Sequence, residues 1–426
     1  MVITLAACGD TDQPGPAATE SAQSAAPPAT VALSVLTAEV DGCPTASVRD
    51  SGQLIYVTLP RACAATTAPV HLLVGMVRQG QWFPAQPLSL ARTVGESDQR
   101  LEAIVGLGRR QVQVVRQGQW REVPHLGSWH GRDGAGLLEL DGALYLLGGW
   151  LYEDVTNEVW KTTDLVHWQF MGHAPWPSRH GAGWLVHNNR LWVIGGDLYA
   201  DVWSSADGVH WNQEAAAAPF GGRYTPNVAS VNGEILVYAG QDWLPEAWCH
   251  DRPDCQARAA TSVWKSRDGR AWVPVLQQTP WAGRALVHGS AVWAGEVYVI
   301  GGGLKVAPPN ERYAETSAEF DDIWSSPDGM NWKRRATTLG FASRTHFSVL
   351  STELGCYVSD GSVAVQNRLS HDFYFASDCV HFEPVAVPTE LPMRHASSLA
   401  AFNGSLVLLG GPPYGKAGTS VWQYFP

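Results

Sequence analysis

The chain has 426 residues, of which 45% are hydrophobic and only 16% are charged, with 43 glycines and 20 tryptophans. This length suits one large domain with a smaller one, and many glycines and aromatics with few charges favour an all-β fold rich in turns. The formal net charge of -11 argues against a surface for nucleic acid or anionic membrane, because phosphate binding needs clustered Lys and Arg. No apolar run approaches the ~20 residues that a membrane-spanning helix requires.

The N-terminus resembles the end of a bacterial lipoprotein signal. Residues 1–8 finish in LAAC, the form of a lipobox, and predict lipidation of Cys8 and attachment to the cell envelope, periplasmic or cell-surface. Residues 9–30 are rich in Pro, Ala, Ser and Thr and are typical of a flexible tether. Only seven residues precede Cys8 and none is Lys or Arg, so we expect a truncated signal and a start further upstream. The alternative is a chance LAAC at a disordered terminus.

The other six of the seven cysteines fall into local pairs, as disulfides in an oxidising compartment often do. The predicted pairs are Cys43 with Cys63, Cys249 with Cys255, and Cys356 with Cys379. No CxxC or Cys/His spacing indicates zinc.

Residues 31–108 lack any repeat and show alternating apolar segments such as QLIYVTLP at 53–60. We expect a small β-sandwich-like domain here. The alternative is that part of this region forms a seventh, divergent repeat unit.

A repeat dominates the remainder, 109–426. The stretch DVWSSADGVHW at 201–211 has relatives with the same spacing between two aromatic residues, at 158–168, 262–272, 322–332 and 372–382, and a sixth copy begins at Ser420. Each copy predicts a β-hairpin, because Asp can bond its own backbone in the turn and Gly accepts a positive φ. Repeated large aromatics at fixed positions are expected to fill the wedges between neighbouring sheets.

Two further features precede each hairpin. One is a strand ending in Gly-Gly, as in NRLWVIGG at 189–196, and the other is an apolar strand that an arginine introduces. One unit is therefore an arginine, strand a, strand b, a loop, strand c, an Asp-Gly turn and strand d. The period of about 43 to 62 residues is that of a four-stranded propeller blade.

The Gly-Gly ending followed by Trp or Tyr resembles kelch repeats, and the SxDGxxW turns are similar to a shortened sialidase Asp-box. The resemblance covers 127–426 and implies an all-β, six-bladed kelch-like β-propeller, similar to the central domain of galactose oxidase. Seven blades remain the alternative. The expected blades are about 127–177, 178–221, 222–283, 284–342, 343–392 and 393–426. The last lacks strand d, so we expect 117–124 to supply it, with residues 120–123 beside 421–424, since an open sheet edge invites aggregation. A propeller fold does not specify an activity.

The residues whose chemical type best suits ligand binding lie in the loops between strands b and c and at the starts of strands a. In a propeller these two places share one face. Long b–c loops occur at 241–260 and 303–320, and loops of this length are usually functional or disordered. The candidate ligand-binding residues are Arg132, Arg179, His180, Arg223, Tyr224, Asp242, Trp243, Arg284, Arg344, His346, Arg394 and His395. Arginine binds carboxylates through two donors and aromatic faces stack on sugars. The alternative is that the repeated arginines bridge neighbouring blades.

We therefore predict an envelope-anchored, non-enzymatic protein that binds a glycan, a small acidic ligand or a protein partner on this loop face. The alternative is a carbohydrate-active enzyme resembling a kelch-type sialic acid mutarotase, with Glu311 and Arg179 as catalytic candidates. The copper site of galactose oxidase needs a Tyr crosslinked to Cys, and here the cysteines pair elsewhere. We expect no metal, no cofactor and no nucleic-acid partner.

Overall fold

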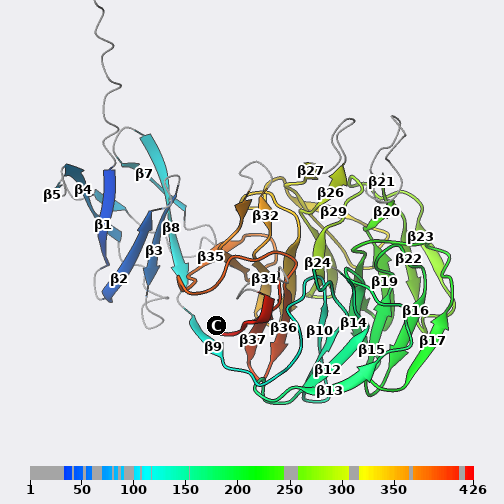
Figure 1. Cartoon of the computed structure of the whole chain (residues 1–426). Helices are drawn as coiled ribbons and strands as arrows, with labels where there is room; N and C mark the ends of the chain where they lie inside the picture. Colours follow the sequence, from blue (N-terminus) through cyan, green and yellow to red (C-terminus); the bar gives the residue numbers. More distant parts are fainter. Residues whose placement is uncertain are drawn as a thin grey trace, which may run out of the picture.

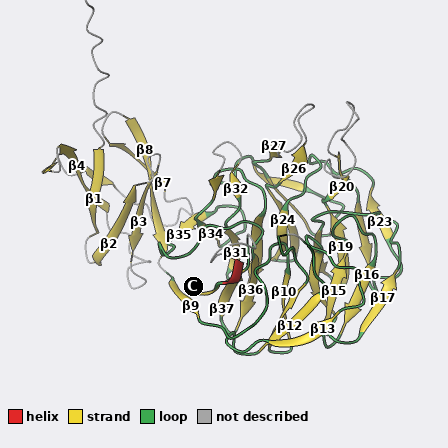
Figure 2. Ribbon diagram, in the orientation of Figure 1, coloured by secondary structure: helices red, strands yellow, loops and turns green. Residues whose placement is uncertain are grey.

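The computed structural model describes eight strands between residues 33 and 116, and residues 118–426 apart from 153, 244–257, 307–315, 364–367 and 412–417. The regular secondary structure of the described chain is almost entirely β-strand (Figures 1 and 2). No helix in these ranges is long and apolar enough to cross a membrane.

Six units of four antiparallel strands follow one another from residue 136 onward (Figure 1). The first is β10 (Gly136–Leu140), β11 (Ala143–Leu147), β12 (Glu158–Thr162) and β13 (Gln169–His173). The second is β14 (Gly183–His187), β15 (Arg190–Ile194), β16 (Val202–Ser205) and β17 (Trp211–Ala215). The third is β18 (Asn227–Val231), β19 (Glu234–Tyr238), β22 (Val263–Ser266) and β23 (Val273–Leu276).

The fourth unit is β24 (Val287–Trp293), β25 (Glu296–Ile300), β28 (Ile323–Ser326) and β29 (Lys333–Ala336). The fifth is β30 (Phe347–Thr352), β31 (Gly355–Ser359), β34 (Phe373–Ala376) and β35 (Glu383–Val385). The sixth is β36 (Ser398–Phe402), β37 (Ser405–Leu409), β38 (Val421–Phe425) and β9 (Gln119–Val123).

The units form a ring. The first strand of each unit lies beside the first strand of the next, and β36 lies beside β10. Between the fourth and fifth units the first strands also form parallel pairs, from Val287 with Phe347 to Ser290 with Leu350. Gly289 permits this approach, since its φ is +86° and a Cβ would lie 2.3 Å from the carbonyl oxygen of Val349. The arrangement is consistent with a propeller-like fold.

The outer strand of the sixth unit comes from the N-terminal side, as the sequence predicts. β9 pairs antiparallel with β38, with Trp120 opposite Tyr424 and Val123 opposite Val421 (Figure 1). The sheet edge that the last repeat leaves open is therefore covered, and the two ends of the repeat region are held in one sheet.

The strands before the repeat follow the order β8-β3-β2-β1-β4-β5, with β6 on β4 and β7 on β8, and they continue the sheet of the fifth unit. These strands are β1 (Leu33–Val40), β2 (Cys43–Asp50), β3 (Leu54–Leu59), β4 (Val70–Arg78), β5 (Gln81–Pro84), β6 (Leu88–Leu90), β7 (Arg100–Val105) and β8 (Gly108–Arg116). Arg116, at the end of β8, pairs with Val385 of the fifth unit. β8 thus carries this sheet beyond the predicted boundary at 108, directly up to β9.

The core lies between the units, because each sheet presents apolar side chains to both of its neighbours. Trp176, for example, is fully buried in a cluster that combines Tyr145 and Leu147 of the first unit with Leu191 and Val193 of the second. Similar clusters fill the other junctions around the ring. The hairpin aromatics Trp203 and Trp211 pack against the cluster around Trp176, which agrees with the role expected for the repeated aromatics between neighbouring sheets.

Three b–c loops rise from one face as short hairpins (Figure 1). They are β20 (Gln241–Trp243) with β21 (Arg258–Ala259), β26 (Gly303–Val306) with β27 (Thr316–Glu319), and β32 (Ser362–Val363) with β33 (Arg368–Leu369). The first two are the bases of the long insertions that the sequence singles out.

The predicted c–d turns are present and explain the SxDG pattern. In the second unit the Oδ1 of Asp207 accepts from the backbone amides of Val209 and His210, each at 2.8 Å, and Gly208 has a φ of +77°. The first and fifth copies place Leu165 and Cys379 at that position, with φ values of +67° and +59°. A left-handed residue with a side chain is strained, so these two turns need support from elsewhere.

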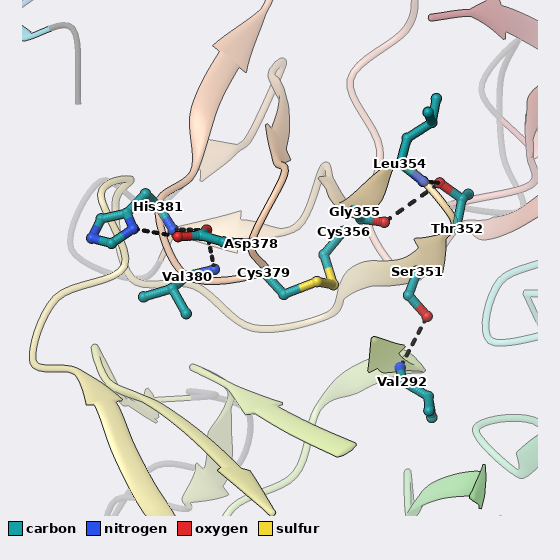
Figure 3. Close-up of a disulfide and its surroundings, with 10 residues drawn as sticks. All are labelled: Val292, Ser351, Thr352, Leu354, Gly355, Cys356, Asp378, Cys379, Val380 and His381. Atoms are coloured by element: carbon teal, nitrogen blue, oxygen red, sulfur yellow. Dashed lines mark hydrogen bonds and ion pairs between the residues drawn. A yellow bond between two sulfur atoms is a disulfide. The ribbon is translucent and has the colours of Figure 1, made fainter. Parts of the chain in front are cut away.

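In the fifth unit a disulfide supplies that support. Cys379 is bonded to Cys356 of β31, and both are fully buried (Figure 3). The prediction for this pair is confirmed. Cys8, Cys63, Cys249 and Cys255 lie outside the described residues, and for Cys43 only the backbone in β2 is described.

We expect the double change Cys356→Ala with Cys379→Ala to lower the free energy of unfolding by about 3 kcal/mol, because the bond closes a loop of 23 residues in the unfolded chain. Urea denaturation with and without reductant measures this. The double variant should also respond less to reductant than the wild-type protein does, and a wild-type protein as stable reduced as oxidised would contradict the expectation.

Candidate binding site at the channel mouth

The six repeated arginines lie inside the sheets. Each is at most 2% exposed. In five of the units Nη1 donates to a carbonyl 16 residues ahead, and in the fourth to one 17 ahead, at the end of strand b. The arginines are Arg132, Arg179, Arg223, Arg284, Arg344 and Arg394.

A carboxylate at the start of strand c completes the arrangement in four units. Arg179, for example, donates to both oxygens of Asp201, at 2.6 and 2.8 Å. The indole of Trp203 donates to the same carboxylate at 2.8 Å. The equivalent acids are Glu158, Asp322 and Asp372. The partners belong to the same unit as the arginine, so these residues tie strands a, b and c together and do not bridge neighbouring units.

This placement indicates a structural role within each unit, which differs both from the predicted cationic pocket and from the alternative of bridging neighbouring blades. The guanidinium groups are enclosed and bonded, which leaves no open face to grip a carboxylate. Arg179 in particular is fully buried, so it does not suit the catalytic role predicted for it.

The third and sixth units lack the acid. Ser262 and Ser420 stand there and accept from Arg223 and Arg394, each at 2.9 Å. Burial lowers the pKa of both arginines to about 10. The charge of Asp242 acts in the opposite direction on Arg223, and the charge of Asp360 does so on Arg394. Asp242 itself is exposed on β20.

A ring of hydrogen bonds encircles the channel two residues after each arginine. Five links join backbone amides to backbone carbonyls, for example Gly181 to Gly134 at 2.9 Å, and the sixth runs from the amide of Leu286 to Oγ1 of Thr225 at 2.8 Å. The members are Gly134, Gly181, Thr225, Leu286, His346 and Ala396. All have φ between +46° and +63°. The ring narrows the channel at the level where the b–c hairpins begin.

Polar side chains stand on this ring in two groups. In the first, Nδ1 of His180 lies 2.9 Å from Oδ2 of Asp197, and its Nε2 lies 3.2 Å from the hydroxyl of Tyr224. His180 and Asp197 each keep 22% of the side chain exposed. The carboxylate fixes the imidazole so that its other nitrogen faces the tyrosine.

The second group continues around the ring. Nε2 of His395 lies 3.4 Å from Oδ2 of Asp133, and the ring of His395 contacts that of His346, which in turn stacks on His288. Burial, together with the charges of His180 and His395, lowers the pKa of His288 to about 3. His288 is therefore neutral at physiological pH.

Asp360 is a buried acid that sequence reasoning missed. It takes the place of the first glycine of Gly-Gly in the fifth unit, and Ser397 of the sixth unit donates to its Oδ2. Burial raises the pKa of Asp360 to about 7, against the hydrogen bond from Ser397 and the charge of Arg394. The sequence LGCYVSDG at 354–361, which departs from the Gly-Gly ending of strand b in other units, could have indicated this acid.

Exposed aromatics lie on the same face. Trp150 exchanges backbone hydrogen bonds with Asp133, and its ring centroid lies 6.0 Å from that of Tyr152, which is 56% exposed. Tyr199, 39% exposed, holds the equivalent place in the second unit. The pattern Gly-Gly-x-Leu-Tyr in these two units was the signal, and the sequence prediction did not use it.

Of the predicted site residues, the structure thus brings His180, Tyr224, His346 and His395 together and encloses the arginines. Glu311 lies outside the described residues, and for Trp243 only the backbone is described. Within the described part of the chain no group of three or more His, Cys, Asp or Glu residues could hold a metal ion.

A comparison of the sequence with models of known protein families finds no match, and a comparison with curated proteins finds none either.

Proposed function

We propose that the chain is a six-bladed kelch-like β-propeller, lipid-anchored at Cys8 in the cell envelope, that binds a glycan at the channel mouth. The observation that carries the proposal is the shared face of exposed aromatic rings and paired His and Asp side chains. Aromatic faces suit sugar rings, and imidazole and carboxylate groups suit sugar hydroxyls.

A polyhydroxylated ligand fits this face better than a small acidic one. The arginines are enclosed by their own units, whereas Asp133 and Asp197 bring two carboxylates to the mouth. A carboxylate ligand would meet like charges there, with only histidines to offset them.

One observation supports the alternative of a carbohydrate-active enzyme. Asp360, with a pKa near 7, has the protonation behaviour of a general acid. It is only 3% exposed and its Oδ2 accepts from Ser397, so it does not contact a sugar at the mouth directly. Binding is the simpler function for the same geometry.

A glycan-binding screen on the whole chain tests the proposal. For the glycan found, Trp150→Ala and His180→Ala should each weaken binding about tenfold or more, the effect of losing a stacking face or a desolvated hydrogen bond. Phe170→Ala is the control, since Phe170 is an aromatic residue, 45% exposed, on the outer strand β13. The proposal fails if the screen finds no ligand, or if all three variants bind alike.

A further inference from the structure

A cavity lies on the side of the hydrogen-bonded ring opposite the proposed glycan site. The first strands of the six units enclose a volume of about 370 Å³. This is within the range of about 300–1,000 Å³ that small-molecule pockets occupy. Its walls are mostly apolar and include Leu137, Trp184, Val186, Leu350 and Leu399.

One end of the cavity is polar. His288 and Ser397 line it immediately below the ring. Nε2 of His288 is buried and has no hydrogen-bond partner among the described residues. A buried imidazole nitrogen without a partner costs free energy, so this atom is placed to bond a molecule inside the cavity.

The other end leads out of the protein. Of the residues that line the cavity, Glu139, Gly289 and Ala401 are exposed, and Glu139 and Ala401 stand near the ends of β10 and β36 that lead into the a–b turns. The opening is therefore on the face opposite the b–c hairpins, away from the proposed glycan site. The ring separates the two.

The charges around the cavity select against a charged occupant. His288 is neutral, and its neighbour Ser397 is a hydroxyl that already donates to Asp360. Glu139 places a carboxylate at the opening. The carboxylate of Glu139 would repel a carboxylate ligand at the opening, and no cation would pair with that ligand at the polar end. Burying an unpaired charge is costly, so a charged ligand is disfavoured.

We propose that this cavity binds a neutral amphiphile, with a hydroxyl head hydrogen-bonded to His288 and Ser397 and an aliphatic body against the apolar walls. The site differs from the proposed glycan site in its opening and in its ligand chemistry, and the two share only the neighbourhood of His288, which stacks on His346.

The test uses 1-octanol as the neutral probe and octanoate as its charged counterpart, on the whole chain, by saturation-transfer NMR and calorimetry. We expect 1-octanol to bind at one site and octanoate to bind at least tenfold more weakly. Ala401→Trp places a bulky ring at the opening and should abolish octanol binding. Ala206→Trp, at an exposed c–d turn residue, is the matched control and should leave it unchanged.

His288→Phe removes the polar partner and keeps a ring of similar size. It should weaken 1-octanol about tenfold, the usual effect of one lost hydrogen bond. Absence of octanol binding, equal binding of octanoate, or unchanged binding to Ala401→Trp would each overturn the proposal. Should His288→Phe fail to fold, the comparison of Ala401→Trp with Ala206→Trp still decides the question.

Discussion

Replacing Asp201 with alanine will lower the free energy of unfolding by about 3–5 kcal/mol, because it leaves the guanidinium of Arg179 buried without its carboxylate. Arg179 is fully buried, and its two Nη atoms both donate to Asp201. The same change also removes the acceptor of the Trp203 indole. Urea denaturation followed by circular dichroism measures the loss.

The protein itself supplies the control. Ser262 accepts from Arg223 in the third unit, so Asp201→Ser should lose less stability than Asp201→Ala. Equal losses for the two variants, or a loss below about 1 kcal/mol for Asp201→Ala, would contradict this expectation. Either result would show that removing the carboxylate does not leave the charge of Arg179 buried and uncompensated.

Replacing Trp176 with alanine will cost about 3–5 kcal/mol, the usual effect of truncating a fully buried tryptophan. Its ring makes edge-on contacts with Trp184 and Trp211, at centroid distances of 6.1 and 5.8 Å, and it lies under the guanidinium of Arg179. A cavity here would separate the first two units. Thermal and urea unfolding both report the change.

Trp203→Ala is the comparison, because Trp203 belongs to the same cluster but is only half-buried. It should cost less than Trp176→Ala. The reverse order would mean that the hydrogen bond of Trp203 to Asp201 contributes more than burial does at this junction.

The two tryptophans of DVWSSADGVHW thus have different tasks. Trp203 donates to the acid that holds the buried arginine, and Trp211 packs on the aromatic residue three positions before that arginine. The same edge-on pairing recurs between Phe220 and Trp272, at 5.0 Å, and between Trp281 and Trp332, at 5.5 Å. The aromatic residue three positions before the arginine is therefore a further element of the repeat, which the sequence prediction did not include.

The architecture could be predicted because it follows from periodic features. Gly-Gly, Asp-Gly and the spaced aromatics each specify a backbone shape that recurs, and the unpaired last repeat requires a strand from elsewhere, which β9 supplies. The site could be predicted only in part. The sequence does not show whether an arginine faces a channel or a backbone carbonyl. Arg179, for example, donates to the carbonyl of Gly195, and only the folded sheet brings these two residues together. Asp360 and the cavity likewise depend on how neighbouring units meet.

The pairing of β9 with β38 has a consequence for the order of folding. β9 is synthesised before any other strand of the ring, and its partner is the last strand of the chain. Until β38 is available, β9 must wait as an unpaired strand while five units assemble. Pairings between such distant segments form slowly, and unpaired strands associate with other chains. We therefore expect aggregation during refolding to originate at this junction, and a variant in which residues 118–123 are moved to follow Pro426 through a short turn to refold faster than the natural chain.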